Sequence, residues 1–111
     1  MNSKNANACV KIAACICGKD GVISKAELEK MFEVVSQQFP TFGFDLFEEA
    51  LDEFFGSDGP IEEFLAAVDD KKTRQFALDL SEVSAAADGL DTRENIALEK
   101  AYLVWGIERR A

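Results

Sequence analysis

Residues 13–28 read AACICGKDGVISKAEL, and residues 82–95 read EVSAAADGLDTREN. Both stretches pass from small residues to Asp-Gly, then to one or two apolar residues, and then to a polar residue with Glu three positions after it. A polar residue followed by Glu at this spacing is typical of a capping box, which starts a helix. The two stretches therefore predict two related helix–turn–helix units whose acidic loops occupy equivalent positions.

Other helix ends are also marked in the sequence. Asp45 is expected to cap a third helix, and Asp69 or Asp70 a fifth, because Asp is a favoured N-cap residue. Arg109 and Arg110 follow the last helix. We expect them to complement the carbonyl end of its dipole.

Helical periodicity dominates the rest of the chain. Apolar residues recur at three- and four-residue spacings, and no window alternates as a strand would. At 111 residues a single domain is expected. We predict an all-α, compact bundle of about six to seven helices, the seventh being a short turn near Pro40. The single domain 1–111 would consist of repeat units at about 9–38 and 71–108 and an acidic helical insert at about 44–69.

Composition excludes several classes of function. Twelve Lys and Arg against 21 Asp and Glu give 12 − 21 = −9, and the chain has no His. Nucleophilic catalysis by a Ser–His or Cys–His pair is excluded, and so are most zinc sites. The acidic balance argues against a nucleic-acid partner, because phosphate contacts need clustered Lys or Arg. We expect no enzymatic activity.

Cys9, Cys15 and Cys17 lie within nine residues of one another. An odd number of cysteines suits a reducing compartment, and buried free Cys is common, so we expect all three in the core. The first residues lack a signal-peptide hydrophobic region, and no apolar run is long enough for a transmembrane segment. The expected location is cytoplasmic, which leaves peripheral membrane association through partners open.

The EF-hand is one comparison for the Asp-Gly loops. Its calcium loop needs oxygen ligands at the first and third positions. Those positions would be Ile16 and Gly18 in the first copy, and Ser84 and Ala86 in the second. Neither loop can supply enough oxygens by itself, so we reject an EF-hand.

The doubled pattern of small-residue helix, Asp-Gly, apolar residue, polar cap and Glu resembles the TerB (tellurite resistance protein B-like) family. The second copy, Ala85-Ala86-Ala87-Asp88-Gly89 through Glu94, matches better, and the resemblance spans about Ala8 to Trp105. It implies a compact helical domain with an acidic candidate metal site, taking part in bacterial stress, tellurite-resistance and phage-defence assemblies. The first copy departs from the pattern, because Cys-Gly-Lys precedes Asp20.

Two interpretations of the acidic loops remain open. In the first, Asp-Gly ends one helix, and the capping boxes Ser24/Glu27 and Asp91/Glu94 start the next, with no further role. In the second, the two loops meet and hold Ca²⁺ or Mg²⁺, since clustered carboxylates suit these hard cations. The metal ligands would then be Asp20, Glu27, Asp88 and Glu94.

The middle of the chain is strongly acidic. Residues 31–70 hold eleven acids and no Lys or Arg. Such a charge run is either a solvated face or a docking surface for a protein with a basic surface. The residues expected in a docking surface are Glu48, Glu49, Asp52, Glu53, Glu62 and Glu63.

These observations favour a non-enzymatic component of a bacterial stress-response complex that binds other proteins, with Ca²⁺ or Mg²⁺ as the candidate cofactor. Two alternatives remain: a cation-responsive regulatory protein, and a carboxylate- or metal-dependent hydrolase. Carboxylate-only hydrolytic sites exist, but the sequence contains no substrate-binding motif.

Overall fold

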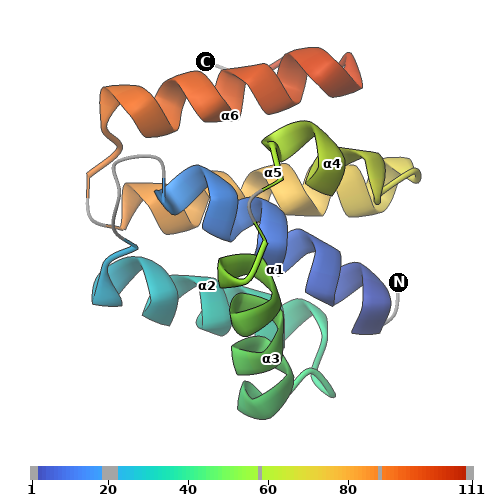
Figure 1. The fold of residues 1–111 in the computed structure, drawn as a ribbon, viewed down its shortest axis with the longest axis vertical. Helices are drawn as coiled ribbons and strands as arrows, with labels where there is room; N and C mark the ends of the chain where they lie inside the picture. Colours follow the sequence, from blue (N-terminus) through green and yellow to red (C-terminus); the bar gives the residue numbers. More distant parts are fainter. Residues whose placement is uncertain (1–2, 19–22, 58, 88, 110–111) are drawn as a thin grey trace.

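The computed structural model describes residues 3–18, 23–57, 59–87 and 89–109 (Figure 1). This part of the chain forms six helices and no strand, which confirms the predicted all-α fold. The helices are α1 (Ser3–Cys17), α2 (Lys25–Gln38), α3 (Phe44–Phe55), α4 (Ile61–Ala66), α5 (Lys71–Ala86) and α6 (Thr92–Trp105). At Pro40 the chain makes a turn and not a seventh helix. None of the described helices is long and apolar enough to cross a membrane.

Helix α1 is the centre of the fold. It contacts each of the other five helices, and residues on all its sides are buried. A helix covered in this way can be apolar around its whole circumference. Small residues such as Ala6, Ala13 and Ala14, all fully buried, let neighbouring helices approach closely.

The three cysteines lie in this central helix. Cys9, Cys15 and Cys17 are buried and not in disulfides, which confirms their predicted place in the core. The Cys9 thiol donates a hydrogen bond to the Thr73 carbonyl on α5, with 3.7 Å between sulfur and oxygen. Burial, with a smaller contribution from the charge of Asp70, raises the pKa of Cys9 to about 12. The thiol is therefore a structural group.

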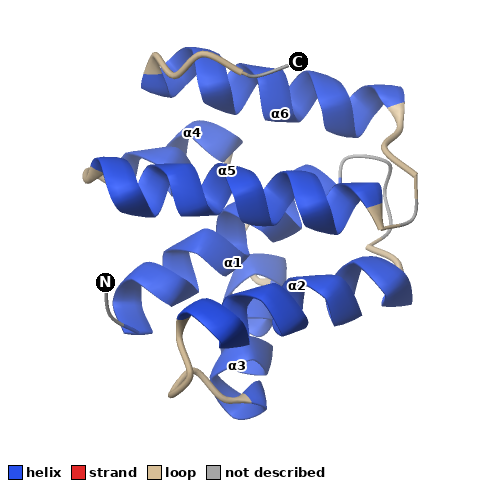
Figure 2. Cartoon of the chain, turned by 180° about the vertical axis from the view of Figure 1, so that it is seen from behind, coloured by secondary structure: helices blue, strands red, loops and turns tan. Residues whose placement is uncertain are grey.

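Helices α6 and α3 lie at opposite ends of the molecule (Figures 1 and 2). Helix α6 packs on α5 and α4, whereas α3 packs on α1. The whole measures 31 × 29 × 27 Å. The short helix α4, which belongs to the acidic middle of the chain, packs on both α1 and α6.

The helix starts confirm most of the predicted caps. Asp70 caps α5 by accepting a hydrogen bond from the Thr73 amide at 2.9 Å. The prediction for Asp45 was wrong: α3 begins at Phe44, after Gly43, and has no side-chain cap. The Phe44 ring packs edge-on against Phe32, with centroids 5.3 Å apart. We attribute the earlier start to this contact, which extends the helix by one residue on its N-terminal side.

Candidate functional site

The two predicted repeat units bring their equivalent ends to one side of the molecule. The ends of α1 and α5 and the starts of α2 and α6 all lie at the left of Figure 1 and at the right of Figure 2. The loops that join these helices include residues 19–22 and 88, which lie outside the described residues. The candidate site is therefore built from the first turns of α2 and α6.

The start of α2 is a complete capping box. The Ser24 hydroxyl accepts a hydrogen bond from the Glu27 amide at 3.1 Å, and Glu27 Oε1 accepts one from the Ser24 amide at 2.8 Å. This confirms the predicted box. It also turns the Glu27 side chain back into the protein, where its exposed fraction is 2%.

The start of α6 repeats this arrangement. Asp91 Oδ1 accepts a hydrogen bond from the Glu94 amide at 2.8 Å, and Glu94 Oε1 accepts one from the Asp91 amide at 3.2 Å. Glu94 is 1% exposed. Just before this box, Gly89 adopts the left-handed conformation with φ 83°, which other residues rarely adopt.

The two capping glutamates meet. The Glu94 carboxyl lies close enough to the Glu27 carboxyl for a hydrogen bond, which can form only when one of the two is protonated. Burial, this hydrogen bond and the negative charge of Glu27 together raise the pKa of Glu94 from 4.5 to about 7. Two carboxyls that come from equivalent positions of the two units thus form one buried pair.

One oxygen of this pair remains unsatisfied. Glu94 Oε2 is buried and has no hydrogen-bond partner among the described residues, apart from the Glu27 carboxyl, which can pair with it only when one of the two is protonated. An unpaired buried carboxylate oxygen is costly. Such a pair is stable when it holds a shared proton or a cation, so the two residues could supply part of the oxygen ligands of a hard divalent ion.

The other two predicted ligands, Asp20 and Asp88, lie outside the described residues. Within residues 3–18, 23–57, 59–87 and 89–109, no group of three or more potential metal ligands is present. A Ca²⁺ ion takes six to eight oxygens. Glu27 and Glu94 alone would thus form only part of a site, and the adjoining loops would have to complete it.

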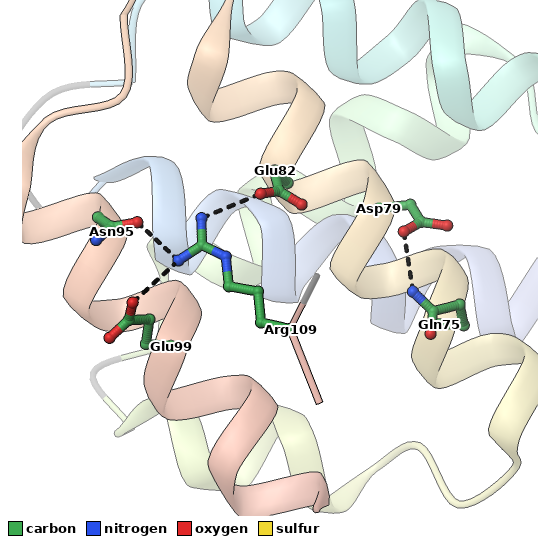
Figure 3. A network of polar contacts seen from close by, with 6 residues as sticks. All are labelled: Gln75, Asp79, Glu82, Asn95, Glu99 and Arg109. Atoms are coloured by element: carbon green, nitrogen blue, oxygen red, sulfur yellow. Dashed lines mark hydrogen bonds and ion pairs between the residues drawn. The ribbon is translucent and has the colours of Figure 1, made fainter. Parts of the chain in front are cut away.

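Arg109 links α5 and α6, the two helices of the second unit, through contacts that the sequence did not predict (Figure 3). Its guanidinium donates to Glu82 on α5 at 3.0 Å, and to Asn95 and Glu99 on α6 at 2.7 and 3.4 Å. Contrary to our expectation for the helix dipole, Arg109 binds these side chains. Arg110 lies outside the described residues. Because Asn95 follows Glu94 directly, this contact fixes the turn that holds the carboxyl pair.

The predicted docking residues Glu48, Glu49, Asp52, Glu53, Glu62 and Glu63 are all exposed. Two of them are paired within the chain. Lys11 lies 2.8 Å from Glu53, and Lys100 lies 2.8 Å from Glu62. The hydrogen bond from Lys11 is the largest cause that lowers the pKa of Glu53.

Comparisons with known proteins add no assignment. No family model matches the sequence, and searches of curated proteins and of solved structures found no significant match.

Proposed function

We propose that this chain is a non-enzymatic protein-interaction domain, similar to TerB, that serves in a bacterial stress response such as tellurite resistance. In this proposal a Ca²⁺ or Mg²⁺ ion joins its two helix–turn–helix units. The observation that carries the proposal is the buried contact between Glu27 and Glu94. These two residues would hold the ion, and Asp20 and Asp88 would supply further oxygens from the adjoining loops.

Burial of the pair favours an ion over an organic substrate. Glu27 and Glu94 are 2% and 1% exposed. A carboxylate hydrolase must place its two carboxyls on either side of a substrate bond. The pair instead makes a direct contact, which leaves no room between the two groups for a substrate. We therefore favour a structural or regulatory ion.

The acidic surface supports the docking role. Within α3, Asp45, Glu48, Glu49, Asp52 and Glu53 are exposed, residues 31–70 include no Lys or Arg, and of these five only Glu53 forms an ion pair among the described residues, with Lys11. Opposite charges steer association and define which partners bind. We propose a basic protein surface as the partner and the cytoplasm as the compartment.

A cation-responsive regulator is the second candidate, and one observation favours it. The carboxyl pair links α2 to α6, so repulsion between two charged glutamates acts across both units. An ion bound between the two carboxylates would remove this repulsion and increase the population of the form in which Glu27 and Glu94 lie together. Metal binding would then itself be the signal to a partner.

Isothermal titration calorimetry of the metal-free protein with Ca²⁺ and with Mg²⁺ tests the proposal. We expect saturable binding of one ion, weakened about tenfold or more in Glu94→Gln. The control is Glu48→Gln, which removes one exposed carboxylate and should leave the affinity unchanged. Absence of saturable binding to the wild-type chain, or equal weakening by both variants, would contradict the proposal.

A further inference from the structure

A hollow of about 340 Å³ lies between α4 and α6. Its walls are Ile61, Ile96, Ala97, Arg93 and Lys100. Three of these side chains are apolar and two are cationic. Such a hollow suits an apolar side chain that has a carboxylate close to it.

The outer face of α6 continues this pattern. Ile96 is 61% exposed and Leu103 is 80% exposed, and Val104 is also exposed. Arg93, Ile96, Lys100 and Leu103 are spaced by three, four and three residues, so they share one face of the helix. Helix α6 is therefore apolar toward the core and partly apolar toward solvent, which is unusual for a surface helix without a partner.

One cation of the hollow is already paired, and the other is not. Lys100 lies 2.8 Å from Glu62 on α4. Arg93, in contrast, forms no ion pair with any acidic side chain in the part of the chain that the structure describes. A carboxylate brought by a partner would find Arg93 at the rim of the hollow.

Helix α3 presents the complementary surface. Phe44 and Phe55 are 54% and 63% exposed, and they lie eleven residues apart, on the same face of the helix. Glu48 and Asp52 are exposed on the adjoining part of this helix. The α3 face thus combines two phenyl rings with carboxylates.

We propose that the hollow between α4 and α6 is the docking site for α3 of a second copy of this chain. Phe55 of one copy enters the hollow of the other, and Asp52 pairs with Arg93. The proposal rests on the docking role of the acidic surface proposed above, and the basic group that meets this surface is Arg93 in the hollow of the second copy. Because α3 and α6 lie at opposite ends of the molecule, the hollow is filled by another copy and not by the chain's own α3 (Figures 1 and 2).

This contact joins two different surfaces, and each copy carries both of them. A heterologous contact of this kind builds closed rings or open chains, unless a second, reciprocal contact closes a dimer. It also contains an aromatic side chain and an Arg, which are the residue types that dominate interface energies.

Sedimentation equilibrium of the full chain, up to about 1 mM, tests the proposal. We expect the average mass of the wild-type protein to rise with concentration. Phe55→Ser and Ile96→Ser should each weaken association about tenfold or more. A one-to-one mixture of these two variants should form a heterodimer, since one supplies the intact hollow and the other the intact α3 face.

The matched control is Val83→Ser, which removes an exposed apolar side chain of α5 that does not line the hollow. It should associate as the wild type does. A wild type that stays monomeric throughout would overturn the proposal, as would a Phe55→Ser variant that self-associates normally or a variant mixture that stays monomeric. Calorimetry with Ca²⁺ and Mg²⁺ on Phe55→Ser keeps the two proposals distinct, because ion binding at Glu27 and Glu94 should be unchanged in that variant.

Discussion

Replacing Glu94 with Gln should stabilise the metal-free protein at alkaline pH. Glu94 is 1% exposed and contacts the Glu27 carboxyl. The Gln amide oxygen can still accept the hydrogen bond from the Asp91 amide that completes the capping box. Its NH₂ group can donate to Glu27 at every pH, whereas a carboxyl can do so only while it is protonated.

The size of this effect follows from the pKa of Glu94. Burial and the contact with Glu27 raise the pKa from 4.5 to about 7 in the folded protein. The folded state therefore binds more protons than the unfolded state between these values, and wild-type stability falls as the pH rises through this window. One pKa unit corresponds to about 1.4 kcal/mol, so the loss by pH 8 should be about 2 to 3 kcal/mol.

Urea denaturation in EDTA at pH 5 and at pH 8 measures this difference. Trp105 is the single Trp, and its indole N–H donates to the Leu65 carbonyl at 3.2 Å, so its fluorescence reports unfolding. We predict that Glu94→Gln is within about 0.5 kcal/mol of the wild type at pH 5. At pH 8 it should be about 1 to 3 kcal/mol more stable than the wild type.

Two results would refute this reasoning. One is a wild type and a Glu94→Gln variant whose stabilities change equally between pH 5 and pH 8. The other is a Glu94→Gln variant that is less stable than the wild type at pH 8 in EDTA. Asp91→Ala is the useful comparison, because it removes a cap, should cost about 1 kcal/mol, and should leave the pH dependence in place.

Three further predictions concern other parts of the fold. All three cysteines are buried, and the pKa of Cys9 is raised to about 12, so the native protein should not react with a thiol reagent such as DTNB. The urea-unfolded protein should react with three equivalents of the reagent. Arg109→Ala removes the contacts with Glu82 and Asn95, and it should lower the free energy of unfolding, measured by urea denaturation, by about 1 kcal/mol. Glu99→Gln removes only a 3.4 Å contact at an exposed side chain, so it should lower this free energy by less. Gly106 ends α6 with φ 66°, so Gly106→Ala should lower the thermal midpoint, at a cost of about 1 kcal/mol, and an unchanged midpoint would contradict the left-handed cap.

The helix starts were predictable where the signal is local. Ser24 and Glu27 are three residues apart, as are Asp91 and Glu94, and each pair satisfies backbone donors of its own turn. Nothing outside the turn is needed to form such a box. The Asp45 prediction failed because tertiary packing of Phe44, invisible in the local sequence, competes with a cap.

Contacts between residues far apart in the sequence were harder to predict. One of the two interpretations of the doubled pattern brings Glu27 and Glu94 into a shared site, but the sequence could not decide between them, because the contact depends on how α2 and α6 are each placed against α5. Arg109 follows the last helix, which suggested an interaction with its carbonyl end. The chain instead reverses after Gly106 and carries Arg109 back along α6 to Asn95.

The central claim is that the two units share one ion site at Glu27 and Glu94. A Ca²⁺ and Mg²⁺ titration of the metal-free protein, followed by backbone amide NMR, tests it most directly. We predict saturable shifts with a single affinity, confined to the amides of residues 19–27 and 88–95. Weak shifts that do not saturate and that spread over the exposed acids of α3 and α4 would contradict the claim, and the two carboxyls would then be helix caps that share a proton.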